Sequence, residues 1–344
     1  MTQAAVSRRP RLGFLGLGWI GRHRFDSVCA TGLAEIAAVA DLDSARAQEA
    51  ADAVPGAVVV AGLDELLDDS RIDGVVIATP SAQHAEQTIR ALEAGKAVFC
   101  QKPLGRDGAE VRSVVEAARR FDRLLDVDFC YRHLAGMDRA RQLVQSGQLG
   151  RIFAAELCFH NAYGPDKEWY YDSRRAGGGC LIDLGVHLGD LTLWMLDAPS
   201  ARASSAALFS EGLAVEAGSS RVEDYAAATL IVEGGTHATL ACSWRLSAGA
   251  DAVISASFYG TAGGVVVRNL GGSFWDFETL HLEGRQARRL GGAPDDWAGR
   301  AILDWTRRLS SGAGFDPAVE RAVAGAEALD SIYAAAGQAE AVLA

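Results

Sequence analysis

The sequence of 344 residues has no excess of basic residues. It contains 33 Lys and Arg against 44 Asp and Glu, which gives a formal net charge of −11. Because proteins that bind nucleic acids present a basic face, this balance argues against a nucleic-acid partner, although a local basic pocket can still bind a phosphate. Hydrophobic residues make up 49% and charged residues 22% of the chain, which is typical of a soluble globular protein, and the length allows two domains.

Cysteine pairs are also missing. The six cysteines are scattered, and no C-x-x-C occurs. This pattern argues against a structural zinc site or a disulfide framework and favours reduced thiols in a cytoplasmic protein. The cysteines are Cys29, Cys100, Cys130, Cys158, Cys180 and Cys242.

Long apolar runs are absent as well. The start, "MTQAAVSRRP", is a short polar and basic lead, and the following "RLGFLGLG" is too short and glycine-rich for the apolar part of a signal peptide. No stretch approaches 18 unbroken apolar residues. We therefore expect a frayed tail before the first strand and no membrane span.

What the sequence does contain, over residues 11–130, is an alternation of short apolar runs with longer amphipathic ones. In residues 82–95, Ala85, Ile89 and Leu92 share a helical face, and Gly95 supplies a stop. Strands that alternate with helices predict a doubly wound parallel sheet, and hence an α/β domain. The apolar runs are "RLGFLG", "EIAAVAD", "AVVVA", "GVVIATP", "AVFCQ" and "LLDVDF".

A glycine motif, "GLGWIG", follows the first expected strand at residues 16–21. In a G-x-G-x-x-G between a strand and a helix, Gly16 permits a tight turn, Gly18 lets a pyrophosphate approach, and Gly21 allows close helix packing. Trp19 and Ile20 belong to the same loop. The helix that follows offers free N–H groups and a positive dipole end to phosphates.

Asp41 ends the second expected strand, 20 residues after Gly21. A carboxylate there accepts hydrogen bonds from the adenine ribose and repels a 2′-phosphate, which favours NAD over NADP. The alternative is that Asp41 is a turn residue or caps the helix that begins near Ser44.

Two further strand ends carry polar residues. "ATPSAQH" follows the fourth strand and "CQKPLG" the fifth. Because ligands bind beyond the carboxyl ends of strands in open α/β sheets, we expect both loops to face the nicotinamide end of the cofactor. The alternatives are a surface role for Lys102 and a capping role for His84. The candidate cofactor contacts here are Thr79, Pro80, His84, Gln101 and Lys102.

The segment "GGGCLIDLGVH", residues 177–187, places three glycines before an aspartate and a histidine. Apolar residues recur at helical spacing from Leu181 to Met195, so a helix begins near Cys180, with Asp183 and His187 on one face. We expect the glycines to let a ligand approach and to leave N–H groups free. The alternatives are an ordinary helical Asp–His pair and a metal site, but no third ligand has suitable spacing.

From about residue 150 the pattern changes to alternating runs separated by glycine turns, such as "EGGT" at 233–236. The runs are "RIFAAELCFHN", "DYAAATLIVEG", "HATLACSWRL", "AVISASFYG", "GVVVRN" and "FWDFETLHL". These runs predict an antiparallel sheet with one covered face, closed by a helix over about 316–343. The other face should carry Trp244, Phe258 or Trp275 and bury itself in a homodimer or homotetramer. The expected domains are therefore residues 1–130 and 131–344.

Residues 163–179 form a polar, aromatic loop, and "YRH" follows the last strand of the first domain. Aromatic rings stack on sugar faces and arginine binds oxygen atoms, so these segments supply candidate substrate contacts; the alternative is a surface loop with packed aromatics. The candidates are Tyr131, Arg132, Trp169, Tyr170 and Arg174.

Taken in order along the chain, these segments resemble the Gfo/Idh/MocA oxidoreductases. The matching segments are "GLGWIG", "VADLD", "ATPSAQH", "CQKPLG", "SGQLGRI" and "AGGGCLIDLGVHLGD". The resemblance implies a Rossmann domain followed by an α/β domain with a large open, mostly antiparallel sheet. It also implies oxidation or reduction of a ring hydroxyl or keto group of a sugar or cyclitol with NAD or NADP.

The resemblance further implies three catalytic residues, Lys102, Asp183 and His187. In this interpretation His187 is the general base, Asp183 orients the imidazole or relays its proton, and Lys102 stabilises the alkoxide. One departure is Gln101, which stands where the family usually has glutamate. Two alternatives stay open: a catalytically silent sugar or nucleotide sensor on the same scaffold, and a reductase of a non-sugar carbonyl.

Overall fold

The computed structural model describes residues 9–215, 219 and 221–343, so the expected frayed tail at residues 1–8 lies outside the described residues. The chain forms two units. Within the described residues, unit 1 comprises the chain up to Gly105, Ala109–Asp128 and Gly299–Glu320, and unit 2 comprises the rest. The first boundary is two residues from the expected one, but the return of residues 299–320 to unit 1 differs from the expected two-segment division.

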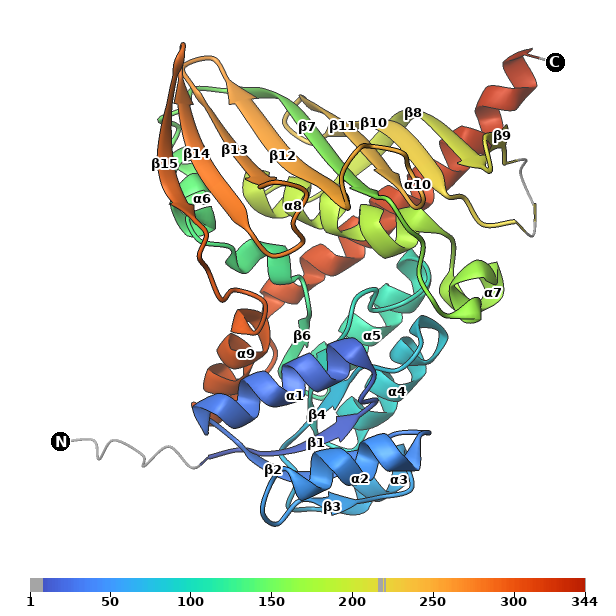
Figure 1. Ribbon diagram of the computed structural model, residues 1–344, viewed down its shortest axis with the longest axis vertical. Coiled ribbons are helices and arrows are strands. Elements are labelled where there is room, and N and C mark those ends of the chain that lie inside the picture. The colour runs from blue at the N-terminus through green and yellow to red at the C-terminus, as the bar shows by residue number, and fades with distance from the viewer. Residues whose placement is uncertain (1–8, 216–218, 220, 344) are drawn as a thin grey trace. The chain divides into compact units, whose positions relative to one another are not determined.

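Unit 1 is built on a six-stranded parallel sheet with the order β3-β2-β1-β4-β5-β6 (Figure 1). The order reverses between β1 and β4, so right-handed crossovers place helices on opposite faces, which confirms the doubly wound prediction. The strands are β1 (Arg11–Leu15), β2 (Glu35–Ala40), β3 (Val58–Val59), β4 (Gly74–Ile77), β5 (Ala97–Cys100) and β6 (Leu125–Val127). The helices are α1 (Trp19–Thr31), α2 (Ser44–Asp52), α3 (Leu63–Asp68), α4 (Ser81–Glu93), α5 (Gly108–Arg120), α9 (Arg300–Ser310) and η4 (Pro317–Glu320).

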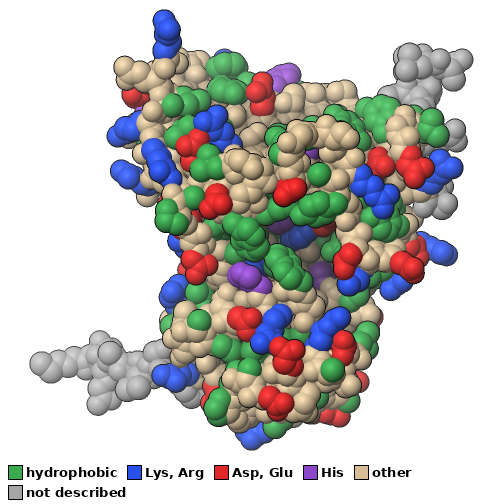
Figure 2. All heavy atoms as spheres, in the orientation of Figure 1, with side chains coloured by type: hydrophobic (Ala, Val, Ile, Leu, Met, Phe, Trp, Pro, Cys, Tyr) green, Lys and Arg blue, Asp and Glu red, His purple; other side chains and the backbone are tan. Residues whose placement is uncertain are grey.

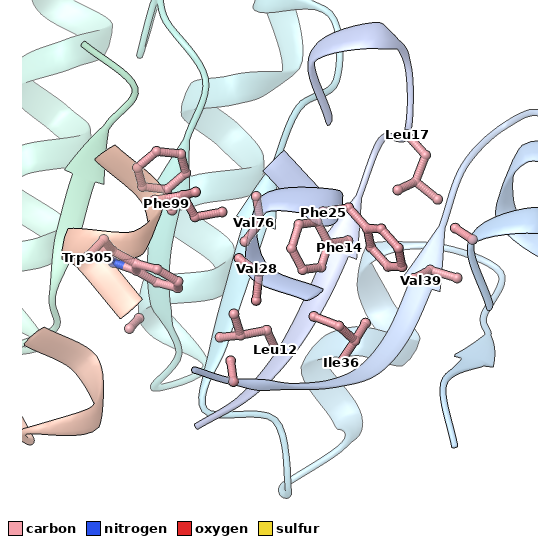
Figure 3. Close-up of a cluster of buried hydrophobic side chains, with 14 of the residues drawn as sticks. Leu12, Phe14, Leu17, Phe25, Val28, Ile36, Val39, Val76, Phe99 and Trp305 are labelled. Carbon is pink, nitrogen blue, oxygen red and sulfur yellow. The ribbon is translucent and has the colours of Figure 1, made fainter. Parts of the chain in front are cut away.

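The core of unit 1 includes a tryptophan from the returning segment. Trp305 of α9 is fully buried, and its ring lies 5.8 Å from that of Phe99 on β5 (Figure 3). A Cβ atom at Gly74 of β4 would lie 2.8 Å from the same indole, so only glycine leaves room for it. Residues 299–320 are therefore part of this domain's packing.

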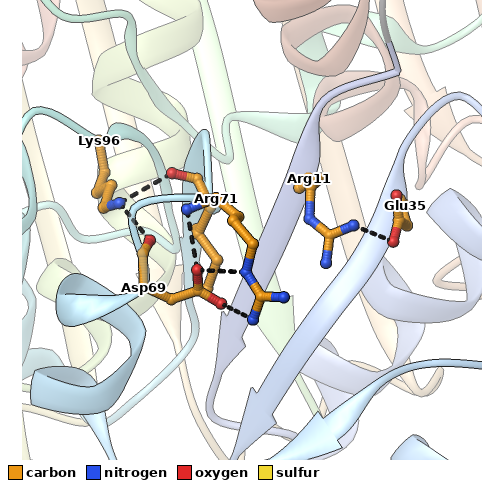
Figure 4. A network of polar contacts seen from close by, with 6 residues as sticks. Arg11, Glu35, Asp69, Arg71 and Lys96 are labelled. Carbon is orange, nitrogen blue, oxygen red and sulfur yellow. Dashed lines mark hydrogen bonds and ion pairs between the residues drawn. The ribbon is translucent and has the colours of Figure 1, made fainter.

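Polar contacts fix the amino-terminal edge of the same sheet (Figure 4). Lys96 donates to the backbone oxygens of Asp69 and Ile72, at 2.7 and 2.9 Å, just before β5. Arg71 contacts both carboxylate oxygens of Asp69 at 2.9 Å, and these hydrogen bonds lower the pKa of Asp69 to about 2. Because ligands bind at the opposite edge, these contacts are structural. Figure 2 shows one face of the molecule, on which acidic and basic side chains are interspersed.

Unit 2 is built on a nine-stranded sheet with the order β15-β14-β13-β12-β7-β11-β10-β8-β9. All neighbouring strands are antiparallel except β7 and β11, which confirms the mostly antiparallel prediction. The "EGGT" hairpin joins β10 to β11 as expected. The strands are β7 (Ile152–Asn161), β8 (Ala201–Ser210), β9 (Leu213–Ala214), β10 (Tyr225–Val232), β11 (Thr236–Ser243), β12 (Ala252–Gly260), β13 (Gly264–Asn269), β14 (Phe277–Glu283) and β15 (Gln286–Gly292).

The helices of unit 2 cover one face of this sheet, where Figure 1 shows α6, α8 and α10. The helical segments are η1 (Cys130–His133), α6 (Met137–Gln145), η2 (Glu168–Tyr171), α7 (Ser173–Ala176), η3 (Leu181–Gly185), α8 (Val186–Leu196) and α10 (Arg321–Leu343). The stretch Ser173–Leu196 has the length and composition of a membrane span, but 83% of its most apolar window is buried inside the protein, as in a core helix.

The aromatic residues expected on the open face of this sheet lie elsewhere. Phe258 is buried on the same face of the sheet as Phe159. Phe159 of β7 pairs with Ile254 of β12, and Phe258 lies four residues after Ile254, so all three side chains point to one face. Trp244 is buried just after β11. Trp275 is exposed in the connection between β13 and β14. The prediction was therefore wrong for all three residues: Phe258 lies on the covered face, because alternation alone does not set which face is covered, and Trp244 and Trp275 lie outside the strands.

We expect Trp305→Ala to lower the free energy of unfolding of unit 1 by about 3–5 kcal/mol, because it removes a fully buried indole and leaves a cavity beside Gly74 and Phe99. Chemical denaturation checks this. Leu42→Ala, at a fully exposed site in the same unit, is the control and should change the value by less than about 0.5 kcal/mol. Equal effects of the two substitutions would contradict the assignment of residues 299–320 to the core of unit 1.

Candidate active site

The glycine loop of unit 1 follows β1. Gly16 has a φ of +90°, and its N–H donates to the Ala40 oxygen at 2.9 Å. A Cβ atom at Gly16 would lie 2.5 Å from the Ala78 oxygen, and one at Gly21 would lie 2.1 Å from the Gly16 oxygen. Both positions therefore require glycine for the packing of the loop itself.

Gly18 has a different surrounding. A Cβ atom at Gly18 would meet no atom within 4 Å, so the space beside this backbone is open, immediately before the first turn of α1. An open glycine at a helix N-terminus fits a dinucleotide pyrophosphate. The neighbouring Trp19 is exposed and Ile20 is half-buried, so both side chains are at least partly accessible beside the open backbone at Gly18.

Asp41 lies directly after β2, as expected. One carboxylate oxygen accepts from the Leu17 N–H at 2.6 Å and the other from the Asp43 N–H at 2.8 Å. Asp41 thus ties the glycine loop to the end of β2. The capping alternative applies to another residue, because Asp43 is the N-cap of α2.

His84 of α4 lies in the interior of unit 1. Its Nδ1 is 2.6 Å from the Pro103 oxygen and its Nε2 is 2.7 Å from the Thr79 oxygen. Burial, and secondarily the charge of Lys102, lowers the pKa of this imidazole, against hydrogen bonds that raise it. His84 therefore joins the chain after β4 to the chain after β5, and its predicted contact with the cofactor stays a prediction.

The residues around His84 include three more of the predicted cofactor contacts. Thr79 donates its hydroxyl to Gln87 at 2.6 Å, and Pro80 is the N-cap of α4. Lys102 is half-buried after β5, next to the buried Gln101. Unit 1 thus gathers these predicted contacts, the glycine loop and Asp41 at the carboxyl edge of one sheet.

The glycine run of unit 2 is held by a buried carboxylate that the sequence did not indicate. Oε1 of Glu223 accepts from the N–H groups of Gly179 and Leu181 and from the hydroxyl of Tyr333, each at 2.9 Å. The Glu223 backbone oxygen accepts from the Cys180 N–H at 2.9 Å. Burial raises the pKa of Glu223, against these hydrogen bonds, which lower it.

The three glycines are therefore required by contacts within unit 2. A Cβ atom at Gly177 would lie 2.8 Å from the Arg106 backbone, one at Gly178 would lie 2.0 Å from the Tyr333 hydroxyl, and one at Gly179 would lie 1.9 Å from the Glu223 oxygen. The expectation of free N–H groups at this helix entrance was wrong, because Glu223 accepts from three of them. That pairing is between residues 44 positions apart, so local sequence could not show it.

Asp183 lies in η3, a turn of π-helix, rather than in the regular α-helix that the sequence predicts. Its Oδ2 accepts from the indole N–H of Trp244 at 3.1 Å. Tyr170 lies edge-on to the same indole, and burial, followed by the negative charge of Asp183, raises the pKa of its hydroxyl. π-helical turns are frequent at functional sites.

His187 follows in the first turn of α8, and its ring is surrounded by aromatic residues. The ring of Tyr131 is edge-on at 4.8 Å, and that of Phe159 on β7 is 6.1 Å away. Tyr131 is itself packed against Trp297 at 5.2 Å. Unit 2 thus brings Tyr131 and His187 together, and this apolar wall restricts the orientation of the imidazole.

The remaining predicted substrate contacts have different surroundings. Arg132 forms an ion pair through two nitrogens with the buried Asp190, which gives it a structural role in unit 2. The Arg174 side chain is 91% exposed. Trp169 and Tyr170 stack with ring centres 3.8 Å apart. Contact of any of these residues with substrate stays a prediction.

Metal chemistry has no candidate site in the described part of the chain, where no group of three or more His, Cys, Asp or Glu side chains is placed to hold an ion. The sequence also did not indicate the side chains that hold these segments in place. They are Trp244 and Glu223 in unit 2 and, in unit 1, Asp128, which accepts hydrogen bonds from the side chains of Gln101 and Arg24. A carboxylate directly after an apolar strand, the signal that identified Asp41, also marks Asp128.

Comparison with protein families gives two matches. Residues 11–129 match the family described as "Oxidoreductase family, NAD-binding Rossmann fold", and residues 137–266 match the "GFO/IDH/MOCA C-terminal domain". The chain belongs to the Gfo/Idh/MocA family. The first matched range runs from β1 to just past β6 in unit 1, and the second runs from α6 into β13 in unit 2.

Curated members of the Gfo/Idh/MocA family resemble the chain over part of their length. Inositol 2-dehydrogenase 3 of Saccharopolyspora erythraea is 35% identical over 190 residues, and the alignment covers 54% of each chain. D-glucoside 3-dehydrogenase of Escherichia coli is 27% identical over 278 residues, covering 78% of this chain and 79% of that one. The first match spans only about half the length of the relative.

Solved Gfo/Idh/MocA structures match nearly the whole chain. GenD2 from gentamicin A biosynthesis, in complex with NAD, is 25% identical with a TM-score of 0.79, and the match covers 96% of this chain and 95% of that chain. Levoglucosan dehydrogenase in complex with NADH is 21% identical with a TM-score of 0.83, covering 96% and 98%. The second likeness shows the fold alone.

We expect Glu223→Ala to destabilise unit 2 by about 3 kcal/mol or more, because three buried donors lose their acceptor. Glu223→Gln keeps an acceptor oxygen in the same place and should cost less than about 1 kcal/mol. Thermal or chemical denaturation of the two variants checks this. A glutamine variant as unstable as the alanine variant would show that the charge, rather than the acceptor atom, holds the glycine run.

Proposed function

We propose that the chain is an NAD-dependent oxidoreductase that interconverts a ring hydroxyl and a keto group of a sugar or cyclitol. The observation that carries the proposal is the presence of Lys102, Asp183 and His187 in a chain whose glycine loop leaves Gly18 open for a dinucleotide. The dehydrogenase names of the relatives support the reaction class. Bound nicotinamide would supply the hydride chemistry.

In this proposal the side chains of the protein manage the proton and the charge. His187 takes the proton of the substrate hydroxyl as general base, with its ring orientation limited by Tyr131 and Phe159. Asp183, fixed by the Trp244 indole, orients the imidazole or relays its proton. Lys102 stabilises the developing alkoxide electrostatically. In reduction the same groups return the proton.

The proposed preference for NAD over NADP rests on Asp41. Its carboxylate is fixed by two N–H groups at the end of β2, next to the glycine loop. A fixed negative charge at this strand end accepts hydrogen bonds from ribose hydroxyls and repels a 2′-phosphate.

A homodimer or homotetramer through the open face of the nine-stranded sheet belongs to the same proposal. On that face β10 carries Ala227 and Ile231 and β12 carries Val253, all only partly buried or exposed. Such a face is stabilised by burial against a second copy. We also propose a cytoplasmic location, which is supported by six free cysteine thiols.

A substrate panel tests the reaction. The purified protein is incubated with NAD and a series of cyclitols, aldoses and glycosides, or with NADH and the corresponding keto compounds, while the absorbance of the reduced cofactor is followed. We expect turnover with at least one ring polyol. Cofactor binding without turnover across the panel would contradict the proposal and favour a sensor; turnover of non-sugar carbonyls alone would favour the other alternative.

We expect His187→Ala to lower kcat by about 10²–10⁴-fold, because the substrate proton loses its acceptor. The affinity for NADH, a property of unit 1, should stay within about threefold, a change of less than 1 kcal/mol. Steady-state kinetics and calorimetric titration measure the two quantities. Wild-type turnover in this variant would remove His187 from the mechanism.

We expect Asp41→Ser to lower the ratio of NAD to NADP affinity by at least about tenfold, or about 1.4 kcal/mol, since the charge that repels a 2′-phosphate is removed while a hydroxyl acceptor is kept. Titration with both cofactors checks this. Asp43→Ser is the neighbouring control, because it removes a carboxylate two residues away while serine still caps α2, so the ratio should not change. An unchanged ratio in Asp41→Ser would show that Asp41 does not select the cofactor.

A further inference from the structure

Three buried polar side chains meet beneath the strand end that carries Lys102. Gln101, directly after β5, is 6% exposed and donates its amide N–H to Oδ2 of Asp128. Asp128, directly after β6, is 1% exposed, and the same Oδ2 accepts from Nε of Arg24 at 2.6 Å. Arg24 lies in α1 and is 2% exposed. We call these residues the Arg24 network.

The charges of this network balance with a neutral residue at position 101. Arg24 supplies one positive charge, Asp128 one negative charge, and Gln101 none. Oδ1 of Asp128 is buried and has no hydrogen-bond partner in the described residues, so one carboxylate oxygen of the network is already unsatisfied. A glutamate at 101 would place a second buried negative charge against Asp128, which is costly.

The network adjoins Lys102 through its neighbour in sequence. The backbone N–H of Gln101 donates to the backbone oxygen of Ile77 at 2.9 Å, and the backbone N–H of Asp128 donates to that of Cys100 at 2.9 Å. On the other side of Lys102, the Pro103 oxygen contacts His84. The backbone of Lys102 is thus fixed on both sides, by α4 through His84 and by α1 through Gln101.

We propose that Arg24 and Asp128 are positioning residues for Lys102, and that Gln101 and Asp128 form a matched pair in which only one of the two positions can hold a carboxylate. This inference rests on the proposed function only for the role of Lys102. The Arg24 network also links the strand end that carries Lys102 to α1, the helix that begins directly after Gly18. The glycine loop and Lys102, both parts of the predicted cofactor site, are therefore held by the same contacts.

A spectroscopic test is practical because the sequence contains only three lysines, Lys96, Lys102 and Lys167. Reductive methylation with ¹³C-formaldehyde gives each lysine its own NMR signal, and Lys102→Arg identifies the signal of Lys102. Gln101→Glu should shift the Lys102 signal, and the exchanged pair Gln101→Glu/Asp128→Asn should return it to the wild-type position. Gln48→Glu is the matched control, since it places a carboxylate beside Asp52 on the exposed face of α2.

Kinetics give a second readout. Gln101→Glu should lower kcat by about tenfold or more, because a misplaced catalytic group loses its alignment, and the exchanged pair should recover most of this loss. NADH affinity, measured separately, should change less than kcat. If no compound in the panel is turned over by the wild type, the proposed function fails, but the NMR comparison still decides the inference.

Two results would overturn the inference. One is a folded Gln101→Glu protein whose Lys102 signal is unchanged. The other is a folded exchanged pair whose Lys102 signal remains displaced. If Gln101→Glu alone does not fold, the exchanged pair decides: recovery of both folding and the wild-type Lys102 signal supports the matched pair.

Discussion

The buried carboxylate of Glu223 is the constraint on which the rest of unit 2's candidate site depends. It is satisfied by neutral donors, two backbone N–H groups and a phenol, so it fixes the path of the chain as well as a side chain. The backbone at Gly179 must lie close to Glu223 to donate these hydrogen bonds, and only glycine allows that approach. The π-helical turn with Asp183 begins immediately afterwards. A purely structural contact therefore determines where the segment with the proposed acid–base residues begins.

Unit 1 uses carboxylates in a comparable way at the ends of its strands. Asp41 after β2 accepts from backbone N–H groups, whereas Asp128 after β6 accepts from the side chains of Arg24 and Gln101. Both lie at the edge where parallel α/β sheets bind ligands. One is half-exposed and can face a ligand, and the other is buried and can only orient its neighbours. Exposure thus separates two chemically identical groups into different roles.

The sequence allowed prediction of those features that depend on local patterns. The glycine loop, six strands of unit 1 and six strands of unit 2 have apolar runs or alternation, and the structure confirms them. Three strands of unit 2 escaped prediction because they lack such a pattern: β8 is rich in alanine and serine, β9 is only two residues long, and β15 is a basic edge strand without an apolar face. Pairings between distant residues, such as Arg24 with Asp128 across 104 positions, have no local signal at all. The contact of the three-glycine segment with Glu223 was missed for the same reason, because it joins residues 44 positions apart.

The return of residues 299–320 to unit 1 has a consequence for how this protein can be divided. The chain leaves unit 1, builds most of unit 2, and comes back with α9 before finishing in unit 2. A fragment cut after residue 130 would contain every strand of the dinucleotide-binding sheet and still expose the surface of Gly74 and Phe99 that Trp305 covers. Such a fragment would be prone to aggregate in solution, because it exposes an apolar patch. The segments of the two units thus alternate along the chain. Neither unit can be replaced by that of a related protein through the exchange of a single continuous segment.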